Sequence, residues 1–382
     1  MDWPMKIIYL VKRYHHHTAS GGYDRLAQAM GGTVVGRTGR GGLGNRVVRR
    51  LWRKWSRPRH YLLDYKDEDW LAECKLLVRA NIKRPDIVHI LYGDDQLDTL
   101  LRWRRLLPCP LVATFHLPAN RDSVKARFEQ HHKHILGGID AAIVVARNQL
   151  PDFQRWLGPE RVVYIPHGID TQRFCPEKGE LNRDVIRLVS VGEHMRDLEA
   201  LHRIMDECRN LKLPVEFNVV ISEKCYPFFS GCSNVRFHTD ITENQLINLY
   251  RKADALLLPI LDATANNAVL ESMACGTPVI STAIGGIPDY VDETAGWLFP
   301  KGEVDGIVGL IKAGCDNREV FLSRRAGARA KSFEFDWQQI KKQMLLLYEA
   351  VRNGLPIDLK SNTTLGGGFT KQGQGQRAEI KR

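Results

Sequence analysis

Short apolar runs alternate with segments of helical spacing along the chain, and this alternation starts twice. The first series of runs predicts strands at 6–11, 33–35, 86–91, 111–115, 141–145 and 162–165. Helical patterns lie between them, near 20–30, 67–80, 94–106, 122–136 and 147–157. Strands that alternate with helices are typical of a parallel sheet with crossover helices, so this half is expected to be an α/β domain.

A charged stretch at 170–184 separates the first series from a second one. Its strands are expected at 186–191, 217–221, 235–238, 255–258 and 278–281, with helices near 195–210, 242–252, 266–275, 303–313 and 316–332. An amphipathic pattern at 336–352 ends the folded region, and the tail at 353–382 is expected to be disordered because it has almost no large apolar residue.

The fold class that follows is α/β, with two doubly wound, Rossmann-like domains facing each other across a cleft. We place the N-terminal domain at 1–170 and the C-terminal domain at 183–335. The helix at 336–352 is expected to pack back toward the N-terminal domain. Ligands of such sheets bind at the carboxyl ends of the strands, which here means between the domains.

Composition narrows the class of protein. The chain has 382 residues, 43% hydrophobic and 26% charged, and no apolar stretch long enough to span a membrane. Its eight cysteines are scattered singly without a CxxC pair, which gives no support to a zinc site or a disulfide framework and favours a reducing cytoplasm. The N-terminus lacks the pattern of a signal peptide.

The net charge of +11 is concentrated in one basic insertion, because residues 37–60 hold nine Arg or Lys and no acidic residue. At 100° per residue, 45–56 separates into an apolar face with two Trp and a basic face. Such a helix suits an anionic membrane interface. We predict peripheral attachment at the cytoplasmic face through Arg49, Arg50, Trp52, Arg53 and Trp55. Packing of the apolar face on its own domain, and nucleic-acid binding, stay open as alternatives.

A Gly pair follows the first strand in the segment YHHHTASGGYDRL, residues 14–26. Gly21 and Gly22 lie between a strand and a helix, where backbone N–H groups favour an anion, although a tight turn has the same pattern. The spacing is not GxGxxG, so a nicotinamide fingerprint is absent. Consecutive histidines of an extended chain alternate faces, which argues against a metal site; only His17, nearest the glycines, is expected to face a ligand.

Two histidines end apolar strands. His116, in TFHLP, is expected to contact a ligand, with a buried core histidine as the alternative. His167, in IPHGID, lies at the domain junction and fits a hinge as well as a binding loop.

The densest signal is at 262–291, DATANNAVLESMACGTPVISTAIGGIPDYV. Glu271 is expected on a short helix over 266–275, and Gly285-Gly286 forms a second Gly loop. Two such loops at neighbouring strand ends predict a nucleotide site, where an ionised Glu can accept two hydrogen bonds from a ribose diol.

These motifs together resemble glycosyltransferase family 4, which has the GT-B fold, over about residues 5–350. The supporting segments are SGGYDRLA, TFHLP, IPHGIDTQRF, LVSVGEHMRDLEAL, YRKADALLLPI and ESMACGTPVISTAIGGIPDYV. The resemblance implies a cytoplasmic enzyme that transfers a sugar from a nucleotide-sugar with retention of configuration, without a metal or other cofactor. A glycan or a lipid-linked molecule at the membrane is the implied acceptor.

The resemblance also implies roles for single residues. His116 would hydrogen-bond the donor sugar, Gly21 and Gly22 would touch the diphosphate, and Glu271 would bind the ribose. Gly285 and Gly286 match the Gly pair that follows the family's E-x7-E motif.

Three positions depart from the family pattern. Ala263 stands where the first Glu of E-x7-E belongs, Glu193 replaces an Arg, and Arg196 replaces a Lys. We predict that Asn266 and Asn267 supply the missing hydrogen bonds and that Arg196 neutralises the diphosphate. The alternative is a catalytically impaired GT-B module that binds nucleotide and acts as a scaffold or partner subunit.

Overall fold

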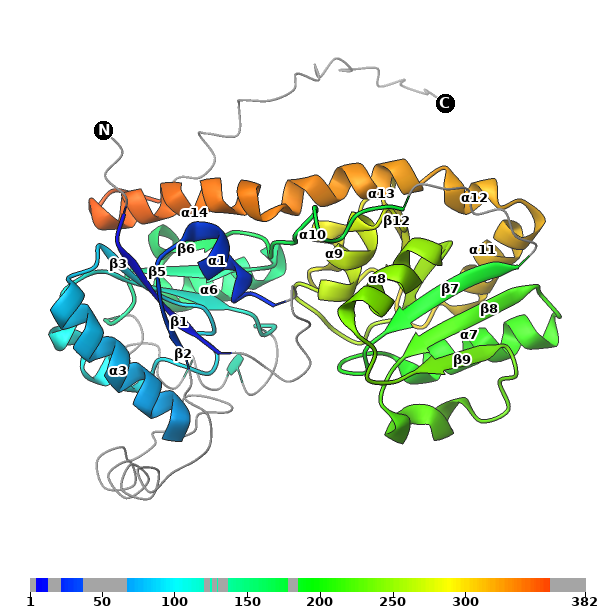
Figure 1. Ribbon diagram of the computed structural model, residues 1–382, viewed down its shortest axis with the longest axis horizontal. Coiled ribbons are helices and arrows are strands. Elements are labelled where there is room, and N and C mark those ends of the chain that lie inside the picture. Colours follow the sequence, from blue (N-terminus) through cyan, green and yellow to red (C-terminus); the bar gives the residue numbers. More distant parts are fainter. Residues whose placement is uncertain are drawn as a thin grey trace, which may run out of the picture.

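A computed structural model describes residues 5–12, 22–36, 67–119, 124–125, 129, 137–177 and 185–357. It has two α/β domains, each built on a six-stranded sheet, shown side by side in Figure 1. Every strand pairing in both sheets is parallel. The predicted α/β class is therefore confirmed.

The N-terminal sheet has the order β2-β1-β3-β4-β5-β6. Its strands are β1 (Ile7–Val11), β2 (Thr33–Gly36), β3 (Ile87–Ile90), β4 (Leu111–Phe115), β5 (Ala141–Val144) and β6 (Val162–Tyr164). The described helices are α1 (Arg25–Met30), α3 (Asp67–Lys83), α4 (Asp98–Arg102) and α6 (Leu150–Leu157), with 3-10 turns η1 (Arg104–Leu106), η2 (Arg147–Gln149) and η3 (Pro159–Arg161). Of the predicted helix at 122–136 the structure describes only residues 124–125 and 129, which are helical, and the basic insertion lies outside the described residues.

The C-terminal sheet has the order β12-β11-β10-β7-β8-β9. Its strands are β7 (Ile186–Val191), β8 (Val215–Val220), β9 (Val235–His238), β10 (Ala255–Leu258), β11 (Val279–Thr282) and β12 (Gly296–Phe299). The helices are α7 (Leu198–Asn210), α8 (Glu243–Lys252), α9 (Asn267–Ala274), α10 (Ile287–Tyr290), α11 (Val304–Asp316), α12 (Glu319–Leu322) and α13 (Arg325–Ser332), with η4 (Glu223–Phe229) and η5 (Phe333–Phe335). Strand β12 is an edge strand that the apolar pattern did not predict.

The last helix, α14 (Trp337–Arg352), runs from the C-terminal domain back over the N-terminal sheet (Figure 1). Its buried face contributes Trp337, Ile340, Met344, Leu347 and Tyr348 to the core on one side of that sheet. The Tyr348 hydroxyl lies 2.6 Å from Nδ1 of His89 on β3, and Nε2 of His89 lies 2.8 Å from Oγ1 of Thr114. Burial lowers the pKa of His89 to about 3, so this histidine is a neutral core residue at pH 7.

The strand orders fix where ligand-binding loops gather. Strand order reverses between β1 and β3 in the first sheet and between β7 and β10 in the second. Loops that leave the carboxyl ends of such neighbouring strands diverge to opposite faces, and ligands bind at that point. The two switch points carry residues 91–96 after β3 and residues 192–197 and 259–266 after β7 and β10, which include Arg196 and Asn266 of the predicted site.

Candidate functional site

The loop after β7 folds Arg196 back onto the end of its own strand. The Arg196 guanidinium donates from Nε to the Val191 carbonyl at 3.1 Å and from Nη1 to the His194 carbonyl at 3.0 Å. Gly192 has φ 83°, and a Cβ there would lie 3.3 Å from Nη2 of Arg196. A glycine thus permits both the turn and the close approach. Burial lowers the pKa of Arg196 to about 10, which leaves it charged at pH 7.

Glu271 lies inside α9 and is 4% exposed. The hydroxyl of Tyr250, on α8, donates a hydrogen bond to Oε2 of Glu271 at 3.0 Å. Burial raises the pKa of Glu271 to about 8, and the Tyr250 hydrogen bond opposes this increase. This burial favours the protonated form of Glu271 at pH 7, because a charge so far from water is unfavourable, whereas the sequence suggested an ionised carboxylate.

The two asparagines occupy the start of α9. Asn266 is the N-cap, and its Oδ1 accepts from the Val269 N–H at 3.4 Å. Asn267 is the first helical residue and is half-buried. The structure thus gives the Asn266 carbonyl oxygen a helix-capping role, which the predicted catalytic role did not include.

Gly285 and Gly286 let the loops after β10 and β11 pack together. Gly285 has φ 60°, and a Cβ there would lie 2.0 Å from the Ala263 carbonyl oxygen. Gly286 donates its N–H to the same oxygen at 2.8 Å. A Cβ on Gly286 would lie 2.4 Å from the Thr264 oxygen and 2.6 Å from Cβ of Ala146 in the other domain. Glycine is thus required at both positions, because a side chain would overlap the backbone of the loop after β10.

His116 follows β4 and is held by groups of its own domain. Its Nε2 lies 2.8 Å from the Leu91 carbonyl oxygen, which can only accept, so Nε2 carries the proton and Nδ1 is an acceptor. The ring stacks on Tyr92 at 4.8 Å and meets the edge of Tyr23 at 4.7 Å. Burial lowers the pKa of His116 to about 4, so the ring is neutral at pH 7.

Direct hydrogen bonds join the two domains beside His116. The Thr264 hydroxyl donates to the His116 carbonyl oxygen at 2.5 Å. Tyr290, on α10, donates to the Val145 carbonyl at 2.5 Å and accepts from the His167 N–H at 3.0 Å. His116, which is expected to contact the donor sugar, is therefore joined directly to the loop after β10 of the other domain.

Of the first Gly pair, Gly22 is described and Gly21 lies outside the described residues, as do the three histidines. Gly22 has φ 98°, and its carbonyl accepts from the Arg25 N–H at 3.3 Å. The next residue, Tyr23, donates its N–H to the Tyr92 hydroxyl at 3.2 Å. This contact places Gly22 next to the His116 environment, and the left-handed backbone explains the glycine.

His167 is buried at the junction between the domains. Its ring lies 5.2 Å from Tyr23 and 5.6 Å from Trp337 of α14. A Cβ on Gly168 would lie 2.3 Å from the Trp337 ring. These contacts give His167 a packing role where the chain passes between domains.

The Glu193 side chain pairs with groups near the end of β8. It forms an ion pair with Lys224 at 2.6 Å and accepts a hydrogen bond from the Ser222 hydroxyl at 2.5 Å. Those hydrogen bonds lower the pKa of Glu193 to about 2, so it is ionised at pH 7. Arg196 is thus the described cation of the loop at 192–197.

Sequence reasoning missed a buried ion pair at the first switch point. Lys12, directly after β1, is 1% exposed and lies 2.8 Å from Oδ2 of Asp95, which follows β3. The neighbouring Asp94 accepts from the His116 N–H at 2.5 Å. A lysine at the end of the apolar run and two aspartates at the end of the third strand were the available signals.

The predicted membrane residues Arg49, Arg50, Trp52, Arg53 and Trp55 lie outside the described residues. Within the described part of the chain, each helix is too short or too polar to cross a bilayer.

Comparison with known proteins agrees with this arrangement. Residues 15–173 match the family described as Glycosyltransferase Family 4, and residues 180–316 match Glycosyl transferases group 1. The MMP alpha-(1->4)-mannosyltransferase of Mycolicibacterium hassiacum is 25% identical over 295 residues, which are 69% of this chain and 70% of that relative. The D-inositol 3-phosphate glycosyltransferase of Saccharomonospora viridis is 28% identical over 169 residues, 44% of this chain but only 35% of the relative.

Solved structures share the fold. Anabaena HepE, in complex with UDP-glucose, superposes with a TM-score of 0.68 at 14% identity and covers 91% of this chain and 100% of its own. Sucrose-phosphate synthase from Thermosynechococcus elongatus gives a TM-score of 0.67 at 18% identity, with the same coverage of 91% and 100%. With one family match in each domain and two parallel sheets in this arrangement, the chain belongs to glycosyltransferase family 4 and has the GT-B fold.

Proposed function

We propose that this glycosyltransferase transfers a sugar from a nucleotide-sugar to an acceptor with retention of configuration and without a metal. One observation carries the proposal: the loops of the two domains meet at the Thr264–His116 hydrogen bond, which joins the domain that holds Arg196 and Glu271 to the domain that holds His116. The HepE complex with UDP-glucose supports a nucleotide-sugar donor for this fold.

Sugar transfer requires stabilisation of the negative charge on the leaving diphosphate. As the glycosidic bond breaks, charge grows on the leaving diphosphate, and fixed donors around it lower the barrier. Arg196 stays charged and is held by two carbonyl hydrogen bonds, so its position costs little reorganisation when the reaction occurs. In the proposed mechanism the acceptor attacks from the face that the diphosphate leaves, and the departing phosphate oxygen takes the acceptor proton.

The neutral His116 contributes an acceptor. Because Nε2 is bound to the Leu91 carbonyl, Nδ1 is the atom that can accept from a hydroxyl of the donor sugar. Its function is therefore to orient the sugar, and its pKa of about 4 means that this role is unchanged between pH 6 and 9.

A panel of nucleotide-sugars tests the activity, with release of the nucleoside diphosphate and product anomericity as readouts. Arg196→Met should lower kcat by 10²–10³-fold, the range seen when one transition-state donor is lost. Arg203→Met, an exposed arginine on α7, is the matched control and should leave kcat unchanged. If the protein binds nucleotide but cleaves none of the nucleotide-sugars in the panel, it is better described as a catalytically impaired scaffold module.

Binding experiments separate the other roles. Glu271→Ala should weaken the affinity for nucleoside diphosphates, whereas His116→Ala should reduce transfer more than nucleotide affinity. Unchanged nucleotide affinity in Glu271→Ala would rule out ribose binding by this residue.

We also propose peripheral attachment of the N-terminal domain to an anionic membrane, which would bring a lipid-linked acceptor to the site. In addition to the basic insertion, described residues support this. Val78 and Ile82 are 60% and 72% exposed one turn apart on α3, and Leu106 after α4 is exposed too. Asn81 on α3 donates to the Leu106 carbonyl at 2.9 Å, so these side chains share one surface. Exposed basic residues on the same elements are Arg79, Lys83, Arg84, Arg102 and Arg105.

Co-sedimentation with vesicles tests the attachment. Binding should require anionic lipid and should fall at least tenfold when Arg49, Arg50, Trp52, Arg53 and Trp55 are replaced together by Ser and Gln. Replacement of Lys301, Lys312 and Arg352, which are exposed elsewhere, is the control for charge alone. Equal binding of all three proteins would refute a role for the insertion.

A further inference from the structure

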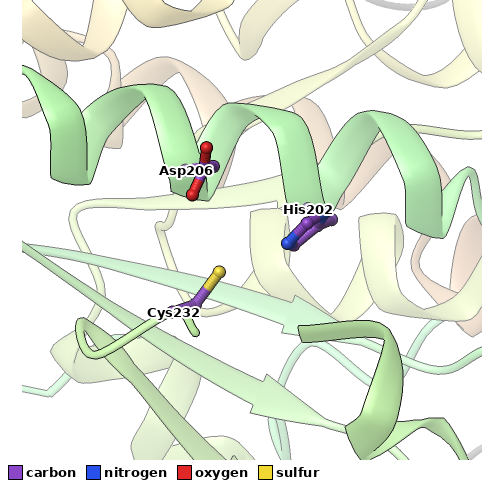
Figure 2. A group of neighbouring side chains, drawn as sticks. All are labelled: His202, Asp206 and Cys232. Carbon is purple, nitrogen blue, oxygen red and sulfur yellow. The ribbon is translucent and has the colours of Figure 1, made fainter. Parts of the chain in front are cut away.

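Three side chains with different metal-binding groups converge on the outer layer of the C-terminal domain. His202 and Asp206 lie on α7, and Cys232 lies in the loop before β9 (Figure 2). One ligand atom from each residue, an imidazole nitrogen, a carboxylate oxygen and the sulfur, lies within 4.8 Å of the others. All three residues are half-buried.

The local structure brings these groups together. His202 and Asp206 are four residues apart, so they project from the same face of the helix. The loop with Cys232 is tied to α7 by two contacts: Arg209 donates to the Gly231 carbonyl, and Asn234 donates from Nδ2 to the Met205 carbonyl at 3.3 Å. The sulfur is therefore held beside α7 by bonds that do not involve the three ligands.

We propose that His202, Asp206 and Cys232 bind a divalent ion of the zinc class. Imidazole, carboxylate and thiolate are the ligands that Zn²⁺ prefers, whereas Mg²⁺ and Ca²⁺ select oxygen ligands. A thiolate and a carboxylate cancel the two charges of the ion, which suits a half-buried position. Three protein ligands leave the fourth tetrahedral position for water.

The neighbours of the site are compatible with this. Asp206 already pairs with Arg209 and accepts from Nδ2 of Asn210 at 3.3 Å. A carboxylate has about four lone-pair sites, so one oxygen can bind a metal while these contacts persist. The His202 ring is also packed edge-on at 6.2 Å from Phe229, which limits its rotation.

An ion at this position would join α7 to the connection between β8 and the edge strand β9. Helix α7 begins directly after Asp197, its N-cap, and Arg196 precedes that residue. The bound ion would therefore stabilise the helix that follows the loop at 192–197. This inference does not rest on the proposed function.

Titration of the purified full chain with Co²⁺ tests the site, because a thiolate bound to Co²⁺ gives a charge-transfer absorption that other ligands do not. We expect one ion per chain with this band, and competition by Zn²⁺. Cys232→Ser should abolish the band, and His202→Asn or Asp206→Asn should weaken Co²⁺ binding at least tenfold. Zn²⁺ should also raise Tm in the wild type and not in Cys232→Ser.

Two controls separate this site from other metal binding. Cys315→Ser removes a half-buried cysteine of the same core cluster and should keep the band. Replacement of His15, His16 and His17 by Ala removes a run of three histidines and should also keep the band. Equal Tm of Cys232→Ser and wild type in EDTA shows that the variant is folded. A wild type without the band, or a band that persists in Cys232→Ser, would overturn the proposal.

Discussion

Glu271→Gln should make the stability of the protein less dependent on pH. The carboxyl of Glu271 is 4% exposed, and burial raises its pKa from 4.5 to about 8. In the unfolded chain the group loses its proton near pH 4.5, whereas in the native protein it keeps the proton up to about pH 8. Ionisation therefore favours the unfolded state throughout this window, and stability falls as pH rises from 4.5 to 8.

The size of the effect follows from the two pKa values. Above pH 8 the difference corresponds to about 5 kcal/mol of lost stability, and the slope inside the window is about 1.4 kcal/mol per pH unit. Gln has no titrating proton, and its carbonyl oxygen can still accept from the Tyr250 hydroxyl. The variant should match the wild type within about 1 kcal/mol near pH 5 and be clearly more stable at pH 8.5.

Urea unfolding at pH 5, 6, 7, 8 and 8.5, followed by far-ultraviolet circular dichroism, measures the free energies of unfolding. Tyr250→Phe is an informative companion, because the hydrogen bond it removes lowers the pKa of Glu271. In that variant the fall in stability should extend to higher pH. If wild type and Glu271→Gln follow parallel curves, Glu271 is not a protonated buried carboxyl and the reasoning is refuted.

Further predictions concern packing and a buried ion pair. Gly286→Ala places a Cβ 2.4 Å from the Thr264 carbonyl oxygen, so it should lower stability by about 1–3 kcal/mol and impair sugar transfer; wild-type behaviour would contradict the backbone contact. Gly309→Ala, exposed on α11 with nothing within 4 Å of the new Cβ, should instead stabilise by about 1 kcal/mol, as measured by urea unfolding. A loss of stability in Gly309→Ala would contradict the open space around this position. Arg318→Ala leaves the buried Asp254 without its 2.8 Å partner and should cost about 3–5 kcal/mol in the same measurement, and a change below 1 kcal/mol would exclude a structural ion pair.

Local patterns predicted the order of elements well. Apolar runs and helical spacing predicted eleven of the described strands and most of the described helices, because parallel strands and amphipathic helices have periods that can be recognised in neighbouring residues. Strand β12 was not predicted because GWLF is short and because no local pattern encodes its pairing with β11.

The candidate site was predicted less completely than the fold. Gly285 and Gly286 were recognised, yet their contacts with Ala263 and Thr264 depend on the neighbouring loop. Asn266 has both the residue type of a helix cap and that of a substrate contact. Its position at the start of α9 shows the cap, and the substrate contact stays a prediction. The basic insertion was visible as a charge pattern, and its membrane role stays a prediction.

The sequence by itself determined the two α/β halves, the position of the Gly loops and the family, since these depend on residue types at short, fixed spacing. Only the tertiary structure decided the protonation of Glu271, the proton position on His116 and the pairing of Lys12 with Asp95. The same holds for the convergence of His202, Asp206 and Cys232. These properties depend on burial and on neighbours far apart in the chain, and water exclusion at such a site shifts a pKa by an amount that no spacing reveals.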